Sequence, residues 1–166
     1  MKIRRETEAD IEAITEITKL AFENHAYSGN TEQFIIHALR AANALTVSLV
    51  AEIDGTVVGH IAFSPVTFSD GSENWYGLGP ISVRPDYQKQ GVGSSLVNEG
   101  LRLIKEADAG GCVVVGEPEY YERFGFKSPD GLEHEGVPQE NFLALAFGGR
   151  IPQGVVEFHP AFGATE

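Results

Sequence analysis

The sequence predicts an α/β fold of the α+β type, with a mixed and mostly antiparallel central sheet. Helical and strand-like segments follow one another in the order βααβββαβαββ, which lacks the regular strand–helix alternation of a doubly wound sheet. Two turn signals, Asp54-Gly55 and Ser69–Ser72, separate consecutive strand-like runs as in antiparallel hairpins. We therefore expect a central sheet of about seven strands, flanked by about four helices, in one domain that spans residues 1–166.

The first strand and the first two helices are predicted from the N-terminal quarter of the chain. Met1–Arg5 is expected to form the strand. Thr7 and Asp10 have the spacing of a helix start, and Asn30 and Gln33 repeat this signal ahead of a second helix. Apolar residues then recur at helical spacing in both segments. These residues are Ile11, Ile14, Ile17, Ala21, Phe34, Ile35, Ala38 and Leu39.

β-Branched and aromatic runs predict the remaining strands, and a long apolar periodicity predicts a third helix. The last two strand-like runs are expected to pair with each other. In chain order, the segments are strands Thr46–Ile53, Thr56–Phe68 and Trp75–Val83, a helix over Gly91–Ala107, a short strand Cys112–Val115, a short helix Glu117–Phe124, and strands Phe142–Phe147 and Val155–Phe158.

Pro80 conflicts with the strand pattern that surrounds it. It lies in the apolar run Trp75–Val83 and follows Gly79. Proline has no N–H to donate to a ladder, so a central strand accepts it only where the ladder is interrupted. A harmless proline on an edge strand is the alternative. Because the run is strongly apolar, we expect a bulge or splay at Gly79-Pro80, a feature that is common beside active sites.

The segment Gln88–Ser94 has the pattern of an anion-binding loop. It follows a predicted strand, opens a predicted helix, and contains Gly91 and Gly93. Bare backbone N–H groups at a helix start, together with the helix dipole, favour a phosphate or pyrophosphate. The loop lacks the Gly-Lys-Ser/Thr ending of a P-loop and the third glycine of a dinucleotide-binding turn. A plain tight turn is the alternative.

Two motifs together resemble the GNAT superfamily of acetyl-CoA-dependent N-acetyltransferases. The segment Gln88–Gly93 is similar to the pyrophosphate-binding motif of that superfamily, and Tyr120–Phe126 is similar to its second signature. Residues 116–121 and 157–162 resemble the YhbS-like subgroup, which extends the similarity over nearly the whole chain. The resemblance implies a GNAT-like sheet with the splay near Gly79-Pro80, and acetyl-CoA as co-substrate.

The resemblance also implies a set of cofactor-binding residues. The main chain of the strand before the loop would line pantetheine, and backbone N–H groups of the loop would hold the pyrophosphate. Lys89 would add positive charge, although a solvated surface lysine is the alternative. The cofactor-binding residues implied are Ile81, Ser82, Val83, Gln88, Lys89, Gln90, Gly91, Val92, Gly93 and Ser94.

Acetyl transfer to an amine needs a neutral nucleophile, a polarised carbonyl and a protonated leaving thiolate. By resemblance, Tyr121 is the general acid, because a tyrosine with a pKa of about 10 holds its proton at neutral pH. Packing against the cofactor is the alternative role. Glu117 is a candidate general base. Weaker candidates on the acceptor side are His60, Glu73, Tyr76 and, in the link between the first two helices, Tyr27.

The amino-acid composition limits the classes of molecule that the protein is expected to bind. The 24 acidic residues against 12 basic ones give a net charge of −12, which disfavours nucleic acid and anionic membrane surfaces and slightly favours cationic acceptors. Cys112 is the one cysteine and lies in an apolar run, so neither a disulfide nor a zinc site is expected. The absence of an apolar span or leader pattern predicts a cytoplasmic protein. The strands after Gly136 are candidates to support a homodimer.

The function predicted is transfer of an acetyl group from acetyl-CoA to a primary amine by direct attack in a ternary complex, without a metal. The acceptor is either a small molecule or a peptide. A non-catalytic acyl-CoA-binding or regulatory module on the same fold is the alternative. A different acyl donor, or an oxygen acceptor, is a third reading.

Overall fold

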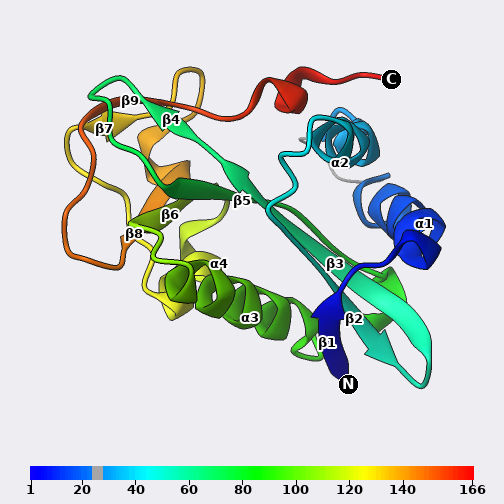
Figure 1. Ribbon diagram of the computed structural model, residues 1–166. Helices are drawn as coiled ribbons and strands as arrows, with labels where there is room; N and C mark the ends of the chain where they lie inside the picture. The colour runs from blue at the N-terminus through cyan, green and yellow to red at the C-terminus, as the bar shows by residue number, and fades with distance from the viewer. Residues whose placement is uncertain (24–27) are drawn as a thin grey trace.

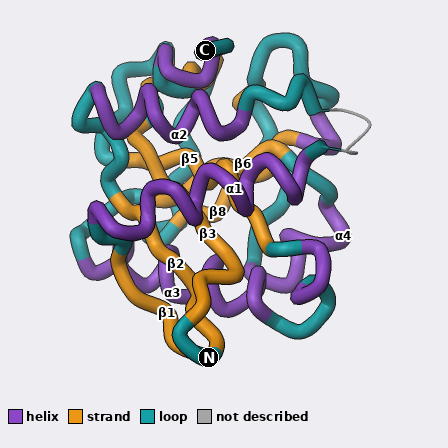
Figure 2. Tube along the Cα trace, turned by 90° about the vertical axis from the view of Figure 1, so that its right-hand side faces the viewer, coloured by secondary structure: helices purple, strands orange, loops and turns teal. Residues whose placement is uncertain are grey.

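The computed structural model describes residues 1–23 and 28–166, and a twisted sheet lies at its centre between two layers of helices (Figure 1). Helices α1 (Ile11–Phe22) and α2 (Glu32–Ala41) cover one face of the sheet. The long helix α3 (Val92–Glu106) and the short helix α4 (Pro118–Tyr121) lie on the other face. Figure 2 shows α1 and α2 in front of the strands that they cover. No helix in the described ranges is long and apolar enough to cross a bilayer.

The central sheet has six strands in the order β1-β2-β3-β5-β6-β8. Only the β5–β6 pair is parallel and the other pairs are antiparallel, so the predicted mixed, mostly antiparallel sheet is confirmed. The hairpin predicted at Asp54-Gly55 is present, and both residues have positive φ angles, 50° and 79°, as a two-residue type I′ turn requires. The strands are β1 (Lys2–Arg5), β2 (Val47–Ile53), β3 (Thr56–Pro65), β5 (Trp75–Val83), β6 (Gly111–Val115) and β8 (Phe142–Ala146).

A second, three-stranded sheet corrects one expectation about pairing. The last two strand-like runs do not pair with each other: β8 pairs with β6, whereas β9 (Gly154–Glu157) lies between β4 (Thr67–Phe68) and β7 (Leu132–Glu133). Alternating apolar residues identify a strand but not its partner. Here Val156 lies in a second core cluster with Phe68 of β4 and Leu132 of β7, and this cluster also contains residues of β5, β6 and β8.

The helices form where the sequence places a continuous apolar stripe against the sheet. Leu96, Val97 and Ile104 of α3 are buried against the core of the central sheet, as the periodicity predicts. Full burial of each such side chain stabilises the fold by roughly 1.5–3 kcal/mol. At the other face, the C-terminal segment around Ala161 packs on Leu39 of α2, which closes the end of the chain over that helix.

The predicted interruption at Gly79-Pro80 is present in the central strand β5. Ile61 of β3 pairs with Ile81 and Phe63 pairs with Leu78, so Gly79 and Pro80 together stand opposite a single residue. On its other side β5 pairs with β6 only over Trp75–Gly77. Within the described residues the two parallel strands then separate, which leaves one edge of β5 open.

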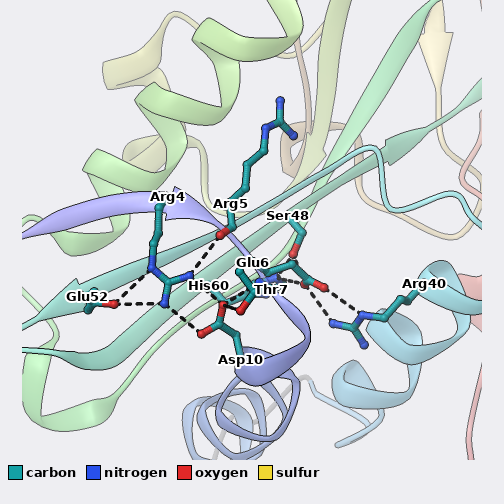
Figure 3. Close-up of polar contacts among 9 residues, drawn as sticks. All are labelled: Arg4, Arg5, Glu6, Thr7, Asp10, Arg40, Ser48, Glu52 and His60. Atoms are coloured by element: carbon teal, nitrogen blue, oxygen red, sulfur yellow. Dashed lines mark hydrogen bonds and ion pairs between the residues drawn. The ribbon is translucent and has the colours of Figure 1, made fainter.

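A partly buried polar network links Ser48 of β2, His60 of β3 and Arg40 of α2 through Glu6, which follows β1 (Figure 3). Arg40 donates two hydrogen bonds of 3.0 Å to Glu6, Ser48 donates to Glu6, and Ser48 Oγ lies 2.8 Å from His60 Nε2. An ionised carboxylate only accepts hydrogen bonds, so the Ser48 hydroxyl donates its hydrogen bond to Glu6, and His60 Nε2 must donate to Ser48 Oγ. The buried Nδ1 of His60, which has no partner among the described residues, is therefore unprotonated.

Burial lowers the pKa of His60 to about 4, and proximity to Glu6 only partly offsets this effect. In the unfolded chain His60 is therefore protonated below about pH 6.5, whereas in the folded chain it is protonated only below about pH 4. We expect this histidine to remove about 3 kcal/mol of stability as the pH falls through that window, and nothing above it. Urea denaturation between pH 7 and pH 4 measures the effect.

The variant His60→Gln should be less stable at pH 7 but should lose less stability on acidification. The pKa of Asp10, which the Arg4 side chain lowers to about 2, places the loss from that group at lower pH. An unchanged pH dependence in His60→Gln would show that His60 is not the titrating group.

Candidate active site

The separation of β5 from β6 opens two adjoining cavities at the centre of the molecule. A groove of about 590 Å³ runs from β5 to the start of α3. A larger cavity of about 900 Å³ lies between the splay, the β6–α4 turn, α2 and the C-terminal segment. Phe22, Ile81 and Tyr120 line both, so the two cavities meet at the end of the open strand edge.

The smaller groove gathers most of the cofactor-binding residues predicted from the sequence. Of that set, only Gln90 and Val92 do not line it. Gln90 is exposed and donates to the Asp86 carbonyl at 3.3 Å, whereas Val92 is buried in the core. The predicted residues that line the groove are Ile81, Ser82, Val83, Gln88, Lys89, Gly91, Gly93 and Ser94.

The start of α3 supplies the groove with hydrogen-bond donors. Gly91 is the N-cap with a φ of 85°, a left-handed conformation that favours glycine. The first helical bond runs from Ser95 N to the Gly91 carbonyl at 3.1 Å, so the three preceding N–H groups have no acceptor within the helix. These groups and the helix dipole make this end of α3 suited to bind an anion.

Two basic side chains add to this positive end. Lys89 lies in the loop, and Arg123 reaches the groove from the turn after α4, where its guanidinium stacks over the Tyr120 ring at 4.6 Å. Gln88 donates to the Val83 carbonyl at 3.0 Å and so fastens the loop to the end of β5. The sequence reasoning missed Arg123, because the motif around it pointed only to the neighbouring tyrosines.

The larger cavity contains the proposed acid. Tyr121 is 7% exposed, lines the cavity beside Gly79 and Pro80, and meets the Tyr120 ring edge-to-face at 5.0 Å. Its hydroxyl makes no hydrogen bond within the described part of the chain. Burial raises the pKa of Tyr121, with a further contribution from Tyr120, so the phenol stays protonated at physiological pH. Gly116 allows this position, because a Cβ there would overlap the Tyr121 ring.

Of the other acceptor-side candidates among the described residues, only Glu117 lines the larger cavity. Glu117 is exposed and lines the larger cavity. His60 is fully buried and Glu73 faces a different surface pocket, so neither reaches the cavity. Tyr76 donates to Asn74 and does not line the cavity either. Tyr27 lies outside the described residues.

His134 is a residue of the cavity that the sequence did not indicate. It follows β7, lines the larger cavity, and stacks on the Phe158 ring at 5.1 Å. Burial lowers its pKa, which favours the neutral imidazole at neutral pH. No local motif surrounds it, and only the pairing of β7 with β9 brings it beside the C-terminal segment.

Neither nucleophilic cysteine chemistry nor a metal centre emerges from the described residues. Cys112 is fully buried and burial raises its pKa, so it is held as the thiol. No group of three or more histidine, cysteine, aspartate or glutamate side chains in the described ranges is placed to hold a metal ion.

Comparison with known proteins places these features in a family. The model of the acetyltransferase (GNAT) family matches residues 11–126. The uncharacterized N-acetyltransferase YhbS of Escherichia coli strain K12 is 38% identical over 128 residues, which cover 76% of this chain and 74% of that protein. Uncharacterized N-acetyltransferase YjhQ from the same strain is 35% identical over 83 residues, 49% of this chain and 46% of that protein.

Two solved structures are similar over almost the whole chain. A GNAT family acetyltransferase from Brucella melitensis, in complex with acetyl-CoA, is 48% identical with a TM-score of 0.87 and coverage of 97% of each chain. Escherichia coli YhbS, in complex with CoA, is 31% identical with a TM-score of 0.87 and covers 99% of this chain and 93% of its own. With the splayed strand, the glycine loop and the buried tyrosine in place, the chain belongs to the GNAT family of acetyltransferases.

Proposed function

We propose that the protein transfers an acetyl group from acetyl-CoA to a primary amine by direct attack within a ternary complex. The observation that carries this proposal is the junction of the two cavities. A groove with the donors and cations suited to a polyanionic cofactor opens, at Ile81 and Tyr120, into a cavity with room for a small molecule or a peptide end. The similar structures that contain acetyl-CoA or CoA support this choice of cofactor.

In the proposed reaction, the neutral amine attacks the thioester carbonyl, a C–N bond forms and the C–S bond breaks. The open edge of β5 would hold pantetheine, and a backbone N–H between Ile81 and Val83 would polarise the carbonyl. Tyr121 gives its proton to the departing sulfur. Glu117 takes the proton that the amine loses, and His134 is an alternative acceptor among the other titratable side chains that line the cavity. No covalent enzyme intermediate is needed.

Steady-state kinetics test the function directly. We expect release of the CoA thiol to depend on an added amine, and double-reciprocal plots for the two substrates to intersect, as a ternary complex requires. Parallel lines would indicate an acetyl-enzyme and contradict direct attack. Binding of acetyl-CoA without transfer to any amine would identify a binding module instead.

A valine at Gly93 tests the proposed cofactor groove. A Cβ at this position would stand 2.9 Å from Tyr120 Oη and 3.9 Å from Val83 Cγ2, inside the groove. We expect Gly93→Val to raise the Kd for CoA by about tenfold or more, equivalent to about 1.4 kcal/mol. Isothermal titration calorimetry measures this Kd. Ser95→Val, on the same helix but outside the groove lining, is the matched control and should bind CoA normally.

Two further predictions are that residues 1–166 form a single domain and that the protein is a homodimer. Sedimentation of the purified protein measures its oligomeric state.

A further inference from the structure

The two cavities differ in the sign of the charges that line them. Among the described residues, the cofactor groove is lined by Lys89 and Arg123 and by no acid. The larger cavity is lined by no lysine or arginine among the described residues. Its carboxylates come from four separate segments of the chain, namely those of Glu32, Glu117, Glu135 and Glu157.

The larger cavity itself offers two unlike environments. Its wall at the splay is buried and apolar, with Leu78 3% and Tyr121 7% exposed. Its rim at the C-terminal segment is exposed, and Glu135 and Glu157 lie there on neighbouring segments, because β7 and β9 pair. Figure 1 shows these two strands side by side, at the end of the molecule away from the N-terminus.

These environments have opposite effects on an amine. A buried apolar wall disfavours the charged form and so favours the neutral amine, which is the nucleophile. Solvated carboxylates favour the protonated form, which cannot attack. An acceptor with two amines could place one in each environment. The amine at the apolar wall would be neutral and react, while the amine at the rim would stay charged.

We propose that the acceptor is a small aliphatic diamine or polyamine, whose distal ammonium is held by Glu135 and Glu157 while its proximal amine reacts beside Tyr121. This inference rests on the proposed acetyl transfer. Among the described residues, neither rim carboxylate makes an ion pair or a side-chain hydrogen bond, whereas Glu32 accepts a hydrogen bond of 2.7 Å from Ser28. A cavity of about 900 Å³ is of the size that binds small molecules.

A matched series of acceptors tests the proposal. Cadaverine, pentylamine and δ-aminovalerate share a five-carbon chain with a primary amine at one end, and at the other end they carry an ammonium, a methyl or a carboxylate group. Because either amine of cadaverine can react, its kcat/KM is compared per amine. With acetyl-CoA as donor, we expect kcat/KM for cadaverine to exceed that for pentylamine by about tenfold, which one solvated charge interaction can supply. The value for δ-aminovalerate should be the lowest of the three.

Two double variants separate local recognition from the overall field of this acidic protein. Glu135→Gln with Glu157→Gln should lower kcat/KM for cadaverine to the level of pentylamine, and should change the value for pentylamine far less than the value for cadaverine. Glu12→Gln with Glu16→Gln changes the net charge equally, on exposed positions of α1 outside the cavity, and should preserve the preference for cadaverine.

The outcomes distinguish this inference from the function on which it rests. Equal use of the three amines, or a preference for δ-aminovalerate, overturns the diamine assignment and leaves amine acetylation standing. Transfer to a lysine peptide but not to cadaverine has the same consequence. Failure to bind acetyl-CoA at all overturns both.

Discussion

Replacement of Tyr121 by phenylalanine should lower kcat by about a hundredfold or more, the usual range for loss of a general acid. The KM for acetyl-CoA should stay close to the wild-type value. The reason is geometric and electrostatic. The ring is fixed by its packing against Tyr120 and Phe126, so phenylalanine fills the same space, and only the proton donor is lost. Because the hydroxyl makes no hydrogen bond within the described part of the chain, its removal leaves no protein partner unsatisfied.

Tyr120→Phe is the matched control for this variant. Tyr120 has the same side chain and touches Tyr121, but its ring packs under Arg123 at the groove. We expect its kcat to change by less than about threefold, since surrounding packing is retained. Initial rates of thiol release at saturating acetyl-CoA measure both variants. Full turnover by Tyr121→Phe would remove the tyrosine from the proton-transfer step and reduce it to a packing residue.

Replacement of Gly100 by alanine should destabilise the fold, although alanine is the better helix former. Helix propensity alone predicts a gain of about 1 kcal/mol for this change in α3. The structure predicts the opposite sign, because a Cβ at position 100 would overlap the ring of Phe63, which is fully buried on β3. Overpacking of this kind costs about 1–3 kcal/mol or more, and α3 must move away from the sheet to relieve it. We expect a net loss of about 2 kcal/mol, or a fall in Tm of about 4–8 °C.

Two further variants test whether packing against Phe63 is the reason that Gly100→Ala destabilises the fold. Asn98→Ala, at an exposed position of the same helix, should be neutral or stabilising by a few tenths of a kcal/mol, as propensity predicts. In the double variant Gly100→Ala with Phe63→Leu, the smaller side chain should recover part of the loss relative to Phe63→Leu alone. Urea denaturation provides each free energy of unfolding. Stabilisation by Gly100→Ala would mean that α3 lies farther from β3 than the structure shows.

Local signals in the sequence were enough to predict most elements and to point to residues that line one groove in the structure. The Asp54-Gly55 hairpin depends on two adjacent residues that tolerate positive φ, and the start of α3 depends on glycines within a few positions of each other. Pro80 is equally local, because a residue without an N–H interrupts a ladder wherever it stands. These features involve the backbone of short segments, so their physical consequences follow from the residues themselves.

Pairing between distant segments could not be predicted in the same way. The sequence identified Val155–Phe158 as strand but assigned it the wrong partner, since alternation of apolar residues states which face is buried and not which strand lies alongside. The placement of His134 beside Phe158 and the convergence of Glu135 with Glu157 both follow from that pairing. The larger cavity is therefore the part of the candidate site that sequence reasoning left undefined.

By itself, then, the sequence determined the fold class, the glycine loop at the start of α3 and the family resemblance, because each is carried by local patterns of residues along the chain. Only the tertiary structure decided that His60 is sealed in a polar network out of reach of substrate, and that Gly100 must admit the ring of Phe63. It alone also showed that the acids and bases of a protein with net charge −12 line different cavities. The burial of a side chain and the sign of the charge around a cavity depend on which distant segments of the chain come together. Tertiary packing determines this.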